Sequence, residues 1–315
     1  MAAAHETGLI TTLLTALPTA APTTRFGRMG RATLRALLLT LLFLTAVGLR
    51  RTWDLRSYTG DALALLTGRV WAYGYRHVER FLAWLAHAGA ADRLTDALAW
   101  WTTQLWQPAA SMTAAPAYYY IDGHRKPVYT DERIPRGLIG RTGAIEGCRA
   151  LVLLHDAQGH PLLATTHRGD QHLTIGLPQV LARYAHATGG PTIDHVVVDR
   201  EGMGGDFLAG LVTAGCTVIT ILRADQYDGL TSFTDIGAFV PLVRDRQGTV
   251  VREVAPARFA LAIPSRLGET LPLRVALIRD LRCQVPVPAS TEADDDLDDP
   301  NWLPPRQRWL AGVQA

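Results

Sequence analysis

Cysteine is scarce in this sequence, and its spacing excludes the common cysteine-based sites. The 315 residues include three cysteines, Cys148, Cys216 and Cys283, and no two of them form a Cys-x-x-Cys pair. Zinc sites built from thiolates need ligands at short spacing, and disulfide-rich domains are small, secreted and carry paired cysteines. Both classes are therefore excluded. The pattern is typical of a reducing environment, so we expect a cytoplasmic localisation.

Long apolar runs are absent as well. The longest covers residues 36–49, about fourteen residues, whereas a helix that spans a membrane needs roughly twenty. It also starts too far from Met1 for an ordinary signal peptide. We therefore predict a buried helix over residues 31–51 and no membrane partner. No glycine-rich phosphate loop, nucleophile elbow or internal repeat occurs, which excludes P-loop proteins, α/β-hydrolases and repeat proteins.

Neither sign of charge dominates the chain. Arginine and lysine together number 31 and the acidic residues 29, so the net charge is only +2. Lysine occurs once, at Lys126, and arginine is frequent between Arg25 and Arg69. With 48% hydrophobic and 19% charged residues, the sequence predicts a folded globular protein, and its length fits about two domains.

Two apolar stretches each end in an aspartate. Residues 193–198 form a β-branched run that stops at Asp199, and residues 118–121 form an aromatic run that stops at Asp122. Such runs are typical of buried strands, and open α/β sheets place their chemistry at the carboxyl ends of strands. Either aspartate alone could simply form a turn or cap a helix. Together they predict a divalent-metal site built from carboxylates.

The hydrophobic period changes along the chain and divides it into four parts. We predict an all-helical domain over residues 1–110, an α/β core over 111–227, a β-rich insertion over 228–285 and an acidic, proline-rich tail over 286–315. In the core, a strand is followed by a β-hairpin, a helix, a strand, a helix and a strand. This order predicts a ribonuclease-H-like mixed sheet. After residue 121, the predicted strands cover residues 126–129, 149–154, 161–166, 193–198, 217–222, 238–243, 249–254, 257–263 and 271–278.

The helical region contains a candidate helix-turn-helix. Two short helices joined near residues 68–74 fit this motif, and the second, over residues 73–85, is strongly amphipathic. In this interpretation Arg69, Arg76 and Arg80 contact DNA. An ordinary helical bundle explains the same pattern, and both interpretations stay open. The positions of the second helix predicted to face inward are Val78, Phe81, Leu82 and Leu85.

The residues around the two aspartates resemble the first two acidic motifs of the DDE transposases of insertion sequences. Tyr-Ile-Asp-Gly-His ends at His124, and Val-Val-Asp-Arg-Glu-Gly ends at Gly202. The resemblance covers residues 55–285 and implies DNA recombination by two-metal phosphodiester cleavage and strand transfer. It implies Asp122 and Asp199 as catalytic residues and ligands of Mg²⁺ (or Mn²⁺). Arg200 is a candidate contact to a DNA phosphate, and an ion pair with Glu201 is the open alternative. The partner it implies is double-stranded DNA at the ends of the element, and a homodimer is an open alternative to a monomer.

The sequence departs from this family in its third carboxylate. The family carries that residue on a helix after the β-rich insertion, and no such helix is predicted here. The remaining acidic candidates are Asp170, Glu201, Glu253 and Glu292, and none lies in a matching helix. We therefore expect a transposase truncated before its third acidic motif, with little or no cleavage activity. Two alternatives stay open: a non-catalytic DNA-binding remnant, and another Mg²⁺-dependent phosphohydrolase.

Overall fold

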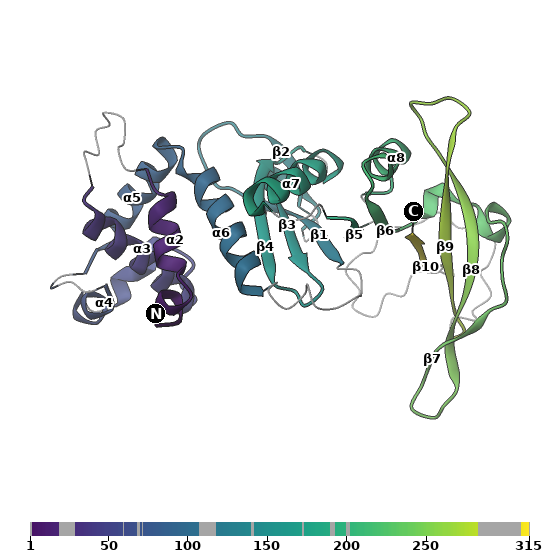
Figure 1. Cartoon of the computed structure of the whole chain (residues 1–315), viewed down its shortest axis with the longest axis horizontal. Coiled ribbons are helices and arrows are strands. Elements are labelled where there is room, and N and C mark those ends of the chain that lie inside the picture. Colours follow the sequence, from purple (N-terminus) through teal and green to yellow (C-terminus); the bar gives the residue numbers. More distant parts are fainter. Residues whose placement is uncertain are drawn as a thin grey trace. The chain divides into compact units, whose positions relative to one another are not determined.

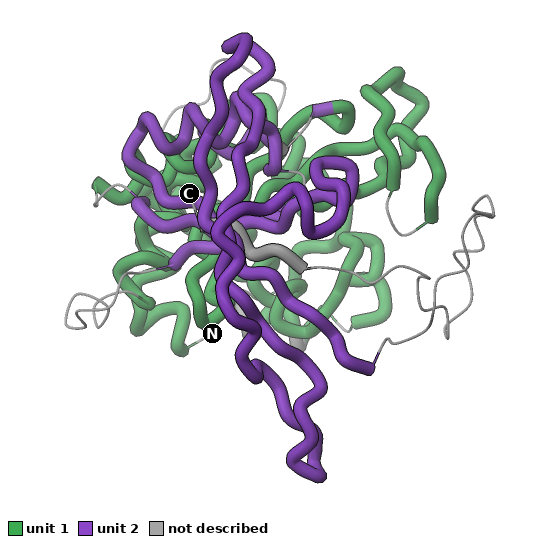
Figure 2. Tube along the Cα trace, turned by 90° about the vertical axis from the view of Figure 1, so that its right-hand side faces the viewer, with its two compact units in different colours: residues 1–116, 123–170, 179–192 green, residues 117–122, 171–178, 193–315 purple. Residues whose placement is uncertain are grey.

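The computed structural model of this protein is a mixed α/β structure whose residues group into two compact units (Figure 2). Unit 1 comprises residues 1–116, 123–170 and 179–192, and unit 2 comprises residues 117–122, 171–178 and 193–315. The structure describes residues 2–18, 29–58, 60–67, 70, 72–106, 118–139, 142–171, 173–189, 193–199, 202–282 and 310–314.

The N-terminal helices of unit 1 pack around an apolar core. Leu37 from the longest apolar run packs there with Phe81 and Trp84. That run forms α3 (Arg31–Ala46), which ends before the predicted residue 51 because Gly48 adopts a left-handed φ of 71° that favours glycine. Among the residues described, no helix is long and apolar enough to cross a membrane. The other helices here are α1 (Ala2–Glu6), α2 (Leu9–Ala16), η1 (Thr52–Ser57), α4 (Gly60–Thr67), α5 (Tyr75–His87) and α6 (Ala90–Trp106) (Figure 1).

Helix α5 has the amphipathic pattern predicted for residues 73–85, with one correction. Val78, Phe81 and Leu85 are buried as predicted. Leu82 is 41% exposed, contrary to the prediction, and Trp84 is buried at 2% exposure. The reason is angular, because a residue three positions after Phe81 lies on the same helix face, whereas the next residue is rotated by about 100°.

Unit 1 also contains the predicted β-hairpin. Strands β3 (Ala144–Asp156) and β4 (Pro161–Arg168) are antiparallel neighbours. Asp156 closes the predicted turn, because its Oδ1 accepts hydrogen bonds from the backbone N–H groups of Gln158 (3.0 Å) and His160 (2.9 Å). The prediction missed the first part of β3 and the strand that pairs with it, which is β2 (Arg136–Ile139).

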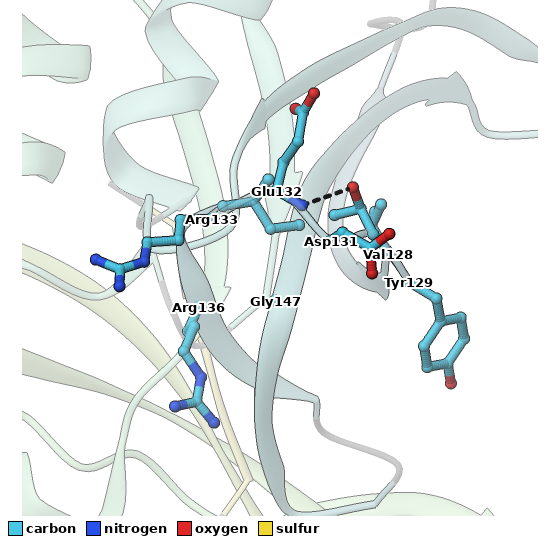
Figure 3. Close-up of a pocket in the computed structure, with 9 residues that line it drawn as sticks. Val128, Tyr129, Asp131, Glu132, Arg133, Arg136 and Gly147 are labelled. Atoms are coloured by element: carbon cyan, nitrogen blue, oxygen red, sulfur yellow. Dashed lines mark hydrogen bonds between the residues drawn. The ribbon is translucent and has the colours of Figure 1, made fainter.

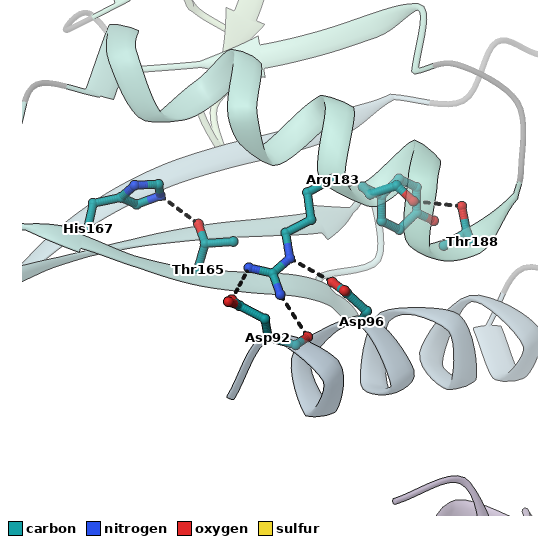
Figure 4. A network of polar contacts seen from close by, with 7 residues as sticks. Asp92, Asp96, Thr165, His167, Arg183 and Thr188 are labelled. Atoms are coloured by element: carbon teal, nitrogen blue, oxygen red, sulfur yellow. Dashed lines mark hydrogen bonds and ion pairs between the residues drawn. The ribbon is translucent and has the colours of Figure 1, made fainter. Parts of the chain in front are cut away.

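A polar network in unit 1 joins α6 to α7 (Leu173–Thr188) (Figure 4). Arg183 on α7 donates from Nε to Oδ1 of Asp96 (2.6 Å) and from Nη1 to Oδ1 of Asp92 (2.8 Å). Desolvation of the guanidinium lowers its pKa, but the hydrogen bonds and charges of Asp96 and Asp92 outweigh that effect and raise the pKa of Arg183. The two helices are therefore joined by a charged contact.

Unit 2 is built on one mixed sheet. Its strands are β1 (Tyr119–Pro127), β5 (His195–Val198), β6 (Thr217–Ile221), β7 (Val240–Arg244), β8 (Val250–Ala262), β9 (Thr270–Asp280) and β10 (Leu310–Gln314), with β1 shared between the units. Their order is β1–β5–β6–β10–β9–β8–β7, in which β1, β5 and β6 are parallel and the others antiparallel. Helix α8 (Gly205–Thr213) follows β5 as predicted. Its start lies so close to β8 that a Cβ on Gly205 would overlap the carbonyl oxygen of Ala262.

Two predictions for the C-terminal part are wrong. Residues 249–254 and 257–263 do not form two strands, because β8 runs continuously through Pro256. Residues 310–314 do not belong to a tail, because they form β10 between β6 and β9. Residues 283–309, with the acidic run, lie outside the part of the chain that the structure describes.

Candidate functional site

The register between β1 and β5 brings the two predicted aspartates to neighbouring positions. The strands are parallel, and Ile121 pairs with Val198. Asp122 and Asp199 are the next residues of the two segments, and both are exposed. Neighbouring strands lie about 4.8 Å apart, so the backbones that carry the two aspartates are separated by about this distance.

Both aspartates directly follow a residue of the buried core. Ile121 and Val198, which precede them, are 2% and 3% exposed and belong to the core. Successive side chains of a strand point to opposite faces, so Asp122, which lies inside β1, points away from this core. Asp199 is exposed in the turn that follows the carboxyl end of β5.

Backbone contacts fix the turn after β5. The carbonyl oxygen of Asp199 accepts hydrogen bonds from the N–H of Gly202 (2.8 Å) and from Oγ1 of Thr220 in β6 (3.1 Å). A Cβ on Gly202 would lie 2.7 Å from Cγ2 of Val198, so the turn needs glycine at this position. The second aspartate is thus held by β5 and β6 together, which is the rigid support that a ligand site requires.

The first aspartate does not lie at the end of its strand, contrary to the prediction. Strand β1 continues to Pro127, so residues 126–129 do not form a separate strand. The pairing of β1 with β5 nevertheless stops at Ile121. Asp122 is therefore the first residue of β1 beyond the β1–β5 ladder.

The donor set at Asp122 and Asp199 fits one hard divalent cation. Mg²⁺ prefers oxygen ligands, keeps several water molecules and is commonly held by one or two carboxylates. Two exposed carboxylates on neighbouring strands meet that requirement. Within the described residues, no group of three or more His, Cys, Asp and Glu side chains could hold a metal ion.

The candidates for a third carboxylate are engaged elsewhere or undescribed. Asp170 accepts hydrogen bonds from Arg168, which lower the pKa of Asp170. Glu253 on β8 forms an ion pair with Arg279 on β9. The remaining two candidates, Glu201 and Glu292, lie outside the described residues.

Two of the arginines predicted to contact DNA are exposed on α5. Arg76 and Arg80 are one helical turn apart and share a face of the helix. Nε of Arg76 donates a hydrogen bond to the hydroxyl of Tyr75 (3.1 Å), and this bond raises the pKa of Arg76. Arg69 and Arg200 lie outside the described residues.

Sequence reasoning missed an aromatic residue beside this helix. Trp53 in η1 is 51% exposed, and the guanidinium of Arg56 lies 4.3 Å from its ring centroid. The ring of Tyr75 lies 4.7 Å from that of Trp53. Stacking orients a guanidinium while its N–H groups can still donate to a phosphate. The available signal was the three-residue spacing of Trp53 and Arg56, since residues i and i+3 eclipse in a 3₁₀-helix.

The loop between β1 and β2 forms a hollow in unit 1 (Figure 3). Figure 3 shows the side chains of Arg133 and Arg136 on the same side, with Glu132 and Tyr129 pointing in other directions. Two acidic and two basic side chains line the hollow, so its charge favours neither an anion nor a cation. Its volume is about 810 Å³, and its lining consists of residues 128–134, Arg136 and Gly147.

Comparisons with known proteins show a distant similarity to a solved structure and no similarity in sequence. No protein-family model matches the sequence, and no curated protein is similar to it. Among solved structures, the chain is similar to the piggyBac transposase in a synaptic complex with hairpin DNA, with 9% sequence identity and a TM-score of 0.39. The match covers 84% of this chain and 55% of that chain, so this chain spans about half the length of the transposase to which it is similar.

Proposed function

We propose that this chain is a transposase-like DNA-processing protein, which binds duplex DNA and holds Mg²⁺ or Mn²⁺ between Asp122 and Asp199. The observation that carries the proposal is the parallel pairing of Ile121 with Val198, which makes two exposed aspartates neighbours. The need to form a turn would by itself explain an aspartate at position 199. It does not explain Asp122, because this residue lies inside a strand.

The order of the elements supports a ribonuclease-H-like core. Strand β1, the short strand β2, the hairpin β3–β4, helix α7, strand β5, helix α8 and strand β6 follow one another along the chain. In unit 1, β3 pairs with β4 and neighbours β1. In unit 2, β1, β5 and β6 lie side by side and parallel. Strands β7, β8 and β9 then correspond to the β-rich insertion implied by the sequence resemblance.

The residues of the chain would act mainly by positioning. A divalent ion bound there would supply Lewis-acid activation of water or of a phosphodiester oxygen. Asp122 and Asp199 would hold it from neighbouring segments, and the hydrogen bond from Gly202 fixes the backbone at Asp199. Both side chains are exposed, which leaves room for a polymer such as DNA. Arg200 directly follows and would contact a phosphate.

Binding of Mn²⁺ to the full chain, followed by its electron paramagnetic resonance signal, tests the site. We expect wild-type protein to bind Mn²⁺, and Asp122→Asn and Asp199→Asn each to weaken that binding by at least tenfold. Asp225→Asn is the matched control, because Asp225 is an exposed aspartate of unit 2 that pairs with Arg223 instead. If the two site variants bind Mn²⁺ as tightly as the control does, the metal site does not exist.

Cleavage of DNA that carries the ends of the element separates the candidate activities. Metal-dependent cleavage that disappears in both site variants would establish a DNA-cleaving enzyme and would contradict the low activity expected from the sequence. DNA and Mn²⁺ binding without cleavage would favour the non-catalytic remnant. Nucleotide hydrolysis in the absence of DNA, lost in the same variants, would favour the Mg²⁺-dependent phosphohydrolase.

A further inference from the structure

An aromatic pair in unit 1 carries two arginines on its rings. The ring of Trp53 in η1 and the ring of Tyr75 at the start of α5 lie 4.7 Å apart in an edge-to-face contact. The guanidinium of Arg56 lies 4.3 Å from the ring centroid of Trp53, and that of Arg76 lies 5.7 Å from the ring centroid of Tyr75. Each ring therefore orients one guanidinium, and we call these four residues the aromatic clamp.

Buried and polar contacts between η1 and α5 hold the aromatic clamp in place. Leu55 of η1 and Val78 of α5 belong to one apolar core, with exposed fractions of 4% and 0%. The hydroxyl of Thr52 in η1 donates a hydrogen bond to Oε1 of Glu79 in α5 (3.1 Å). The two rings come from these two packed elements, so the fold sets their positions before any ligand binds.

The acidic residues of the same two segments are engaged with η1 and not with the clamp. Glu79 accepts the hydroxyl of η1 just described, and Asp54 Oδ2 accepts a backbone N–H at the start of η1 (3.2 Å). Within the part of the chain that the structure describes, neither Arg56 nor Arg76 forms an ion pair with a carboxylate. Residues 50–58 and 72–80 contain an excess of exposed arginine over acidic residues: Arg50, Arg51, Arg56, Arg76 and Arg80, with Asp54 and Glu79.

The clamp is open to a ligand. Trp53 is 51% exposed, and both of the clamp's arginines are exposed. The hydrogen bond from Arg76 to the hydroxyl of Tyr75 uses Nε (3.1 Å) and leaves the terminal Nη groups to donate elsewhere. A guanidinium that stacks on a ring keeps its in-plane N–H groups available, and these groups match the oxygens of a phosphate.

We infer that Arg56 and Arg76 bind backbone phosphates of duplex DNA, with Trp53 and Tyr75 as their positioning residues. The inference rests on the proposed function and adds η1 to the DNA contact predicted for α5. The rings restrict the guanidinium groups before binding, so less conformational freedom is lost when a phosphate is bound. Because phosphates and no base edges are contacted, the contact is independent of DNA sequence.

Fluorescence anisotropy of a labelled duplex with the full chain, at several salt concentrations, tests the phosphate contacts. We expect Arg56→Ala/Arg76→Ala to reduce the slope of log K against log[salt] by about 2, roughly one for each arginine, equally for unrelated DNA sequences. Arg168→Ala is the matched control, because Arg168 is an exposed arginine of unit 1 that pairs with Asp170. Its slope should equal that of the wild type.

Variants of Trp53 test the positioning role, because they keep both arginines. We expect Trp53→Leu to weaken DNA binding about two- to fivefold at a fixed salt concentration, which is the value of an exposed contact between a cation and a ring. Its salt slope should stay close to that of the wild type, since no charge is removed. Trp53→Phe should recover most of the affinity because it restores a ring under Arg56. A loss that Trp53→Phe does not recover would refute the positioning role.

The outcomes separate this inference from the proposed function. If the wild-type chain binds duplex DNA and Arg56→Ala/Arg76→Ala keeps the wild-type slope, the aromatic clamp is refuted and the proposed DNA binding stands. If the wild-type chain does not bind duplex DNA, both are refuted. Thermal unfolding by circular dichroism identifies misfolded variants. Should the alanine variant unfold, Arg56→Gln/Arg76→Gln keeps most of the aliphatic stems and should show the same reduced slope.

Discussion

Arg183 gives the sharpest test of the energetics of unit 1, because its two acidic partners differ strongly in solvent exposure. Its side chain is 25% exposed, Asp96 is 34% exposed and Asp92 is 82% exposed. The ion pair with Asp92 lies largely in water and should contribute less than about 0.5 kcal/mol. The partly buried bond to Asp96 should contribute about 1 to 1.5 kcal/mol, and the packed aliphatic stem adds several tenths. We expect Arg183→Ala to lower the free energy of unfolding by about 2 kcal/mol.

Thermal unfolding and a double-mutant cycle check this value. A loss of about 2 kcal/mol corresponds to a melting temperature lowered by about 4 °C in a chain of this size. The cycle of Arg183→Ala with Asp96→Ala should give a coupling energy of about 1 kcal/mol. Arg168→Ala is the control, because its contact with Asp170 joins two exposed residues in one turn and should contribute nothing measurable. Equal melting temperatures for the two arginine variants, or zero coupling to Asp96, would refute the reasoning.

Two further predictions concern unit 2. Gly205→Ala should lower the free energy of unfolding in urea by about 2 to 3 kcal/mol, because the new Cβ overlaps the Ala262 carbonyl oxygen. Gly210→Ala in the same helix is the control, and it should raise this free energy slightly because its Cβ meets open space. The hydrogen bond from Arg282 holds the pKa of Asp280 well below its ordinary range. The unfolded state therefore binds a proton first as pH falls, so the stability deficit of Asp280→Asn should be full at pH 7 and shrink below about pH 4. A deficit that does not change with pH would contradict this cause.

Local patterns were sufficient to predict most elements. The prediction for residues 217–222 matches β6 within one residue, and that for residues 73–85 matches α5 within two. The strands predicted over residues 238–243 and 249–254 leave a short connection between them, and Asp245 Oδ1 closes it as a turn by accepting hydrogen bonds from the N–H groups of Gln247 and Thr249. These features depend on neighbours within a few residues, so the sequence contains the information directly.

The strands that were predicted incorrectly depend on partners that are distant in the sequence. Pro256 indicates a break between two strands, because proline lacks the N–H that a ladder needs. In β8 its carbonyl oxygen accepts a hydrogen bond from the N–H of Gly237. The N and O of one residue point to the same side of an antiparallel strand, so the missing N–H lies toward Gly237, and the pairing with β9 is intact. Strand β10 was missed for the same reason, since its partners are β6 and β9.

The candidate metal site follows the same rule. The sequence predicted that Asp122 and Asp199 act together because each follows an apolar run, but the run alone does not say which strands are neighbours. The register of β1 with β5, in which Ile121 pairs with Val198, makes the two aspartates neighbours. A register is set by the backbone hydrogen bonds and the buried side chains of whole strands, so the pairing of two residues 77 positions apart is a property of the fold and not of either local pattern. The proposed function therefore depends on this register, and the Mn²⁺-binding test of Asp122→Asn and Asp199→Asn examines the two residues as one site.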